Sequence, residues 1–127
     1  MLGQRTTLGV GPIATRQGRA FVRDVLAGPN LPPERVADAM LVASELISNA
    51  VRHAEPGEAI DVAVGLDGDR LRVEVSPVHR ESDLSFVVID GVAHAWGVDG
   101  RTGWADLRAT RGPVSAGRPG TSTASPR

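Results

Sequence analysis

The segment from residue 36 to residue 54 constrains the fold most strongly, because it combines a helical apolar stripe with an acid and an amide one turn apart. Glu45 and Asn49 are four residues apart, so their side chains stack on roughly the opposite side of the helix from the stripe. This polar pair fits either a solvated face or a cleft. The stripe follows the helical period and comprises Val36, Ala43, Ile47 and Ala50, with Met40 and Val51 alongside.

The composition is that of one ordinary globular domain. The chain has 127 residues, 41% of them hydrophobic, and a formal net charge of −1. Because the charges balance, neither nucleic acid nor an anionic membrane is an expected partner. Cysteine and lysine are absent, which excludes disulfides, thiolate metal sites and Schiff-base chemistry.

The same composition suggests where the protein works. No segment approaches the roughly 18 apolar residues of a membrane span, and the N-terminus has no signal-peptide pattern. We therefore expect a cytoplasmic protein. Every basic side chain other than histidine is arginine, a bias typical of a GC-rich bacterial genome.

The first half of the chain predicts a strand and two helices. Residues 4–10 alternate weakly, as in an edge strand. A helical pattern begins at Pro12 and ends at Gly28, where glycine can take a left-handed cap. The second helix begins at Pro32 and runs to about Ala54.

The second half predicts two hairpins separated by a helix. The first hairpin alternates apolar and polar residues on both sides of a turn at Asp67–Gly68. The predicted segments are strands at 59–66 and 71–75, a helix from Leu84 to Trp96, and closing strands at 96–98 and 102–107.

The end of the chain has a different composition. From residue 109 onward, Gly, Pro, Ser, Thr and Arg dominate, and such a segment cannot bury enough apolar surface to become ordered. We therefore expect one domain, residues 1–108, and a disordered tail, residues 109–127.

The sequence SELISNAVRHA, from Ser44 to Ala54, resembles the N box of the GHKL (Bergerat-fold, histidine-kinase-like) ATPases, in the branch of anti-sigma regulatory factor serine/threonine kinases. The resemblance implies that Glu45 is the catalytic base and that Asn49 holds the Mg²⁺ bridging the ATP phosphates. His53 would lie beside them, one helical turn further on. The resemblance to this family extends over about residues 5–108. It includes the motif RxFVRD in the first predicted helix, the predicted strand RLRVEVS and the motif AxxWGV.

The resemblance also implies a fold and a class of partner. The fold would be a two-layer α/β (α+β) sandwich, with helices on one face of a mixed sheet. The partner would be a sigma factor, or an anti-anti-sigma factor bearing the serine to be phosphorylated. Regulation of transcription would follow, and a homodimer is compatible with it.

Two nucleotide-binding motifs of that family are altered here. Pro77 stands where an Asp should accept the adenine amino group, and proline offers no side-chain acceptor. Asp83 and Ser85 replace two glycines that would cradle phosphate at a helix N-terminus, and the loop that would form the ATP lid is short. Arg80 is the residue in this loop that could restore phosphate affinity. We therefore expect binding of ATP and Mg²⁺ to be weakened or lost.

A second hypothesis gives the nucleotide cleft a new use. Glu45 together with His53 or His79 would form an acid–base pocket for a small molecule. A metal site made by His53, His79 and His94 is a weaker alternative, because scattered histidines are more often surface residues.

Overall fold

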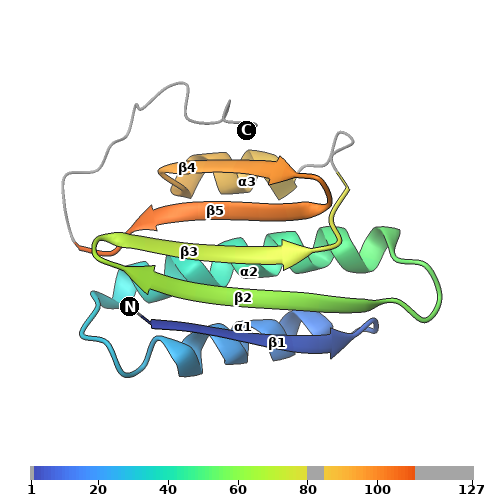
Figure 1. Cartoon of the computed structure of the whole chain (residues 1–127), viewed down its shortest axis with the longest axis horizontal. Helices are drawn as coiled ribbons and strands as arrows, with labels where there is room; N and C mark the ends of the chain where they lie inside the picture. Colours follow the sequence, from blue (N-terminus) through green and yellow to red (C-terminus); the bar gives the residue numbers. More distant parts are fainter. Residues whose placement is uncertain (1, 80–84, 111–127) are drawn as a thin grey trace.

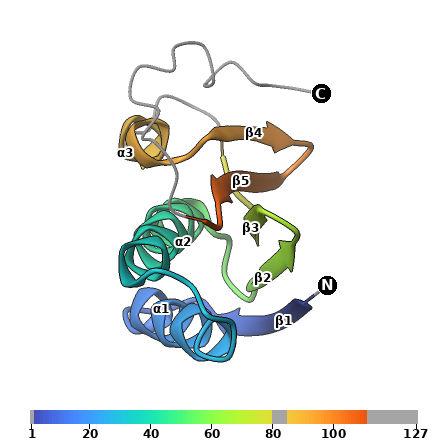
Figure 2. The ribbon, with the colours of Figure 1, turned by 90° about the vertical axis from the view of Figure 1, so that its left-hand side faces the viewer.

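The computed structural model describes residues 2–79 and 85–110, which form a sheet with all its helices on one face (Figures 1 and 2). The two-layer α/β sandwich is therefore confirmed. In chain order the elements are β1 (Leu2–Gly9), α1 (Ala14–Val25), α2 (Pro33–His53), β2 (Ala59–Asp67), β3 (Arg70–Ser76), α3 (Ser85–Val92), β4 (Ala95–Asp99) and β5 (Thr102–Arg108).

The five strands lie in the order β1-β2-β3-β5-β4. Every pairing among the described residues is antiparallel, so the prediction of a mixed sheet is wrong. Tight turns join β2 to β3 and β4 to β5, with Gly68 at φ 63° and Gly100 at φ 66°. Such turns reverse the chain between neighbouring strands, which leaves antiparallel pairing as the only outcome for these two pairs.

The core lies between α2 and the inner face of β2 and β3. The alternation predicted for these strands is confirmed, since every second residue except Leu66, which is half-buried near the end of β2, is at most 1% exposed. These strand residues are Ile60, Val62, Val64, Leu71, Val73 and Val75. The apolar stripe of α2 packs against them, with Ala43, Ile47 and Ala50 at 0% exposure.

Helix α2 is buried on more sides than the apolar stripe predicts. It contacts α1, α3 and the sheet, so Ser44 and Asn49 are buried along with the stripe. At Gly18 of α1 a Cβ atom would collide with the side chain of Ile47, so α1 and α2 approach closely there. The side of α2 opposite the stripe is therefore partly interior.

The predicted C-terminal end of the third helix, at Trp96, is wrong. Helix α3 ends at Val92, and the amide of His94 already donates to the carbonyl of Asp106 on β5, at 2.7 Å. Trp96 instead lies in β4, where its indole stacks on Phe86 with ring centroids 5.1 Å apart. Pairing with β5 and this aromatic contact outweigh the helical pattern. The predicted start, Leu84, lies outside the described residues.

The other boundaries differ from prediction by a few residues. Strand β1 begins at Leu2, and α1 begins at Ala14, two residues after Pro12. The fold continues past β5, because the amides of Ala109 and Thr110 bond to Asp69 in the β2–β3 turn. The predicted tail from residue 111 lies outside the described residues. Within the described ranges, no helix has the length and apolar content needed to cross a membrane.

We expect Ile47→Ala to lower the free energy of unfolding by about 2–5 kcal/mol, since it leaves a cavity between α2, α1 and the sheet. Val87→Ala is the control, because Val87 is 66% exposed and its truncation should cost under about 0.5 kcal/mol. Urea denaturation measures both values. Equal losses in the two variants would contradict the packing described for α2.

Candidate functional site

The predicted site residues form one row along α2. Glu45, Asn49 and His53 are spaced four residues apart on this helix, so each lies about one turn beyond the last. Asn49 is 0% exposed, Glu45 is half-buried, and His53 is exposed near the C-terminal end of the helix. The row passes beside residues 77–79, which follow β3.

Asn49 holds the main chain of His79 through two hydrogen bonds. Its Nδ2 donates to the carbonyl oxygen of His79 at 2.8 Å, and the amide of His79 donates to Oδ1 at 2.8 Å. The side-chain amide thus pairs with one residue's backbone much as a neighbouring strand would. Because buried backbone groups need partners, this contact fixes the chain after β3 against α2.

The residues before His79 are also anchored. The amide of Val78 donates to the carbonyl oxygen of Arg101 at 2.9 Å, and the Val78 side chain is 3% exposed. The Ser76–Pro77 peptide bond is cis. The segment is therefore fixed on one side by the β4–β5 turn and on the other by Asn49.

Two of the predicted histidines meet at this segment. The rings of His53 and His79 have centroids 4.8 Å apart and are tilted by 44°. Nε2 of His79 is buried and has no hydrogen-bond partner among the described residues. His94 is exposed between α3 and β4 and does not join this pair. Within the described ranges, no group of three His, Cys, Asp or Glu side chains is placed to hold a metal ion.

Glu45 differs from its neighbours in the row because, within the described part of the chain, no hydrogen bond or ion pair engages its carboxylate. Its half-buried position would suit a general base if a substrate reached it. Arg80 and Asp83 lie outside the described residues. Ser85 is the first residue of α3.

The described residues do not fit the ATP and Mg²⁺ that the resemblance implies. A magnesium ion keeps several water ligands, yet Asn49 is 0% exposed and both polar ends of its side chain bond to His79. Pro77 supplies no side-chain acceptor for an adenine amino group. Nucleotide binding would thus require the Asn49–His79 contact to open.

The comparisons with known proteins agree with this architecture. A profile of the histidine kinase-like ATPase domain matches residues 11–85, so the chain belongs to that family. A similar solved structure contains the RsbU and RsbW domains of Rv1364c from Mycobacterium tuberculosis, with 23% sequence identity and a TM-score of 0.73. The match covers 88% of this chain and 34% of that one, so this chain spans about a third of its relative. No curated protein sequence matches.

We expect Asn49→Ala to lower the free energy of unfolding by about 2–4 kcal/mol, because it leaves the amide and carbonyl of His79 without their partners. The control is Ser48→Ala, a half-buried neighbour on the same helix, with an expected loss under about 0.5 kcal/mol. Urea denaturation measures both. A loss in Asn49→Ala as small as the control's would show that the contact does not fix the segment.

Proposed function

We propose that this protein is a regulatory domain of the anti-sigma factor kinase type that acts through protein contacts, with weakened or lost ATP binding. Family membership and the RsbW-like fold support the class. The observation that carries the proposal is the double hydrogen bond between Asn49 and the His79 backbone. It occupies the side chain that would otherwise hold magnesium.

The free-energy cost of opening the Asn49–His79 contact favours a binding protein over a kinase. Opening the contact exposes two buried backbone groups and the amide of Asn49, at a cost of about 2–4 kcal/mol. Each 1.4 kcal/mol is tenfold in affinity, so a micromolar nucleotide site would weaken about 30- to 1,000-fold, to a dissociation constant between tens of micromolar and about 1 mM. The absent adenine acceptor at Pro77 weakens it further. With the nucleotide site weakened in this way, regulation would depend on binding to the partner.

The proposed partner is a sigma factor or an anti-anti-sigma factor in the cytoplasm of a bacterium. The similar structure carries RsbU and RsbW domains in one chain, so proteins of this fold occur beside other regulatory domains. Serine phosphorylation of the partner would require the nucleotide site to open, with Glu45 as base. We therefore propose binding to the partner, and not its phosphorylation, as the main function.

A second candidate function uses the same row of residues. Among the described residues, Nε2 of His79 is buried without a hydrogen-bond partner, and the His79 ring contacts His53, so two of the three groups of the acid–base hypothesis are together. Glu45 lies two turns of α2 before His53. Proton transfer on a small metabolite is the reaction class that this set would support.

Titration of Mg-ATP into the protein, followed calorimetrically, tests the loss of nucleotide binding. We expect no saturable heat up to about 1 mM ATP, since the Asn49–His79 contact and Pro77 together remove several kcal/mol of binding free energy. Micromolar binding by the wild-type protein, reduced in Glu45→Gln or Asn49→Ala, would contradict the proposal and favour a serine kinase.

Regulation by contact and acid–base catalysis differ in their dependence on Glu45. We expect Glu45→Gln, which keeps size and hydrogen bonding, to bind sigma and anti-anti-sigma factors of the source genome as the wild type does. Surface plasmon resonance with the purified proteins measures this. A catalytic pocket predicts loss of turnover in the same variant instead. Failure of every such factor to bind the wild type would reject the contact hypothesis.

A further inference from the structure

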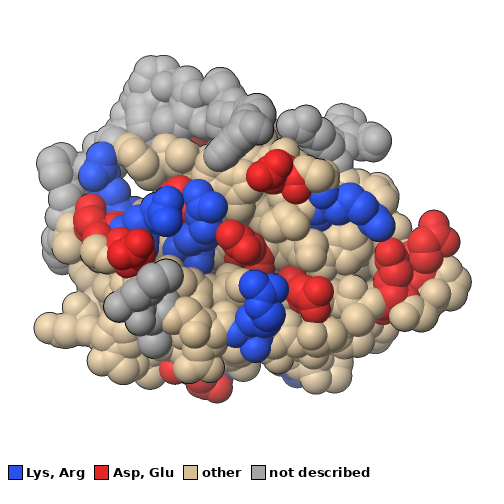
Figure 3. Space-filling model, viewed as in Figure 1, with Lys and Arg blue, Asp and Glu red and all other residues tan. Residues whose placement is uncertain are grey.

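The outer face of the sheet, opposite the helices, carries charged side chains drawn from three neighbouring strands. Figure 3 shows blue and red groups interspersed over this face. The register explains the arrangement: Arg5 of β1 pairs with Ala63 of β2, which pairs with Glu74 of β3. Along β3, Arg70, Arg72 and Glu74 alternate with the buried core residues. Because one face of an antiparallel sheet can be open, these groups are available to ligands.

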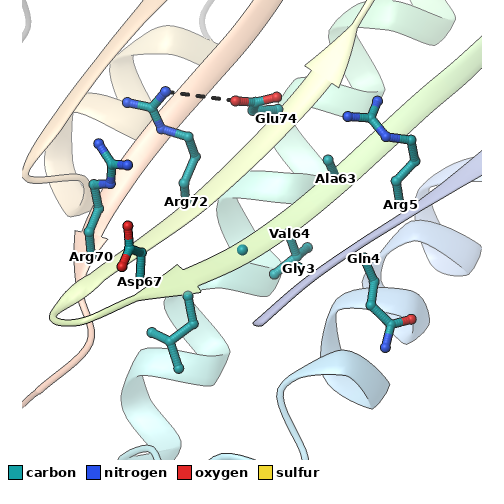
Figure 4. A pocket seen from close by; sticks show the side chains of 11 residues that line it. Gly3, Gln4, Arg5, Ala63, Val64, Asp67, Arg70, Arg72 and Glu74 are labelled. Atoms are coloured by element: carbon teal, nitrogen blue, oxygen red, sulfur yellow. Dashed lines mark ion pairs between the residues drawn. The ribbon is translucent and has the colours of Figure 1, made fainter. Parts of the chain in front are cut away.

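A hollow of about 440 Å³ lies on this face over β1, β2 and β3 (Figure 4). Its floor consists of residues with little or no side chain, namely Gly3, Ala63 and Gly65. Gly3 and Gly65 are direct partners across β1 and β2. The volume is within the range of small-molecule sites.

The glycine at position 3 is not needed by the packing of the fold. A Cβ atom there would meet only the carbonyl oxygen of Val64, at 3.9 Å, among the described neighbours. Glycine within a strand weakens it and often marks a place where a ligand or another backbone approaches. Packing within the described residues therefore does not explain the glycine at position 3.

Arg72 forms a fixed wall of the hollow. Its guanidinium donates twice to Asp106, at 2.7 and 2.9 Å, and lies 3.7 Å from Glu74. The same group lies over the ring of Trp104, 4.5 Å from its centroid. The hydrogen bonds with Asp106 raise the pKa of Arg72, so its charge is permanent. Such a paired arginine shapes the site more than it attracts a ligand.

Arg5 and Arg70 are different, because neither has an ion pair or hydrogen bond within the described part of the chain. They stand at opposite ends of the hollow, on β1 and β3, with β2 running between them (Figure 4). Arg70 is four residues from Glu74 on β3, and Glu74 lies level with Arg5 across Ala63 of β2. The Cα atoms of Arg5 and Arg70 are therefore about 13 Å apart along the strands and about 10 Å apart across them. Each unpaired guanidinium can bind a carboxylate or phosphate through two parallel hydrogen bonds.

We infer that the hollow binds a small molecule with two separated acidic groups, one held by Arg5 and the other by Arg70. The body of the ligand lies on Gly3, Ala63 and Gly65, and its polar groups donate to Glu74 and Asp67, which also line the hollow. The ligand class is a bisphosphate or a polycarboxylate. This site is on the opposite face of the sheet from the row of Glu45, Asn49 and His53, so the inference does not depend on the proposed regulatory function.

Calorimetric titration with fructose 1,6-bisphosphate and with citrate tests the site, and fructose 6-phosphate serves as the probe that lacks one acidic group. We expect saturable binding of at least one of the two probes. If the bisphosphate binds, the monophosphate should bind about tenfold more weakly or worse, since one guanidinium contact is lost. Which of the two probes binds distinguishes phosphate from carboxylate as the ligand chemistry.

Three variants on the outer face and one control assign the binding to the hollow. Arg5→Gln and Arg70→Gln should each weaken binding about tenfold or more, and Ala63→Leu should abolish it by filling the floor while keeping every charge. Arg16→Gln on α1 removes an exposed arginine from the helical layer and should leave the affinity unchanged. Thermal unfolding verifies that each variant keeps its fold.

Four outcomes of the binding experiments would overturn the inference. They are no saturable binding of either probe at about 10 mM, equal affinity for the mono- and bisphosphate, an effect of Arg16→Gln as large as that of Arg5→Gln, and binding undiminished in Ala63→Leu. Sedimentation provides a further check. A dimer that dissociates in Ala63→Leu would show that a second copy of the chain covers this face, and the inference would then be wrong.

Discussion

The functional side of the molecule depends on one buried amide. Asn49 is four residues beyond the acid of the same helix, a spacing that suits a base and a metal ligand at one phosphate. The fold instead uses its two polar ends to hold the backbone of His79. The residue type that identifies the family is thus retained, while its hydrogen bonds connect α2 to the chain that leaves β3.

The same contact explains why a buried polar residue is tolerated in the core. An unpaired amide at 0% exposure would cost several kcal/mol, so Asn49 is stable there only with a partner of matching geometry. The backbone of one residue supplies both a donor and an acceptor. Pro77, two positions earlier, could not have done so because it lacks the N–H.

The fold was largely predictable because its periodic segments are long. The alternation from Ile60 to Val75 and the apolar stripe of α2 predict the hairpin, the long helix and the core between them. The end of α3 was not predictable, because Trp96 is placed in β4 by two contacts that the sequence pattern does not reveal. These are its pairing with β5 and its stacking on Phe86. The mixed sheet came from the resemblance and not from any local signal.

The row of polar residues on α2 was predictable, but its hydrogen bonds were not. The spacing of Glu45, Asn49 and His53 places them in one row, as expected. The partner of Asn49 is 30 residues away in sequence, and no periodicity connects the two. The hollow of the outer face was not predictable either, because Gly3 and Gly65 are far apart in sequence and become neighbours only when β1 pairs with β2.

The place of β1 at the edge of the sheet has a consequence for how the chain folds. Thr7 meets Asp61 across 54 positions, so pairing β1 with β2 closes a loop that contains both α1 and α2. The β2–β3 hairpin, by contrast, closes over a two-residue turn. Because closing the longer loop costs more entropy, we expect the β2–β3 hairpin to form before β1 adds to its edge. In native-state hydrogen exchange, β1 should be the strand that opens at the lowest free energy, and the floor of the outer hollow opens with it.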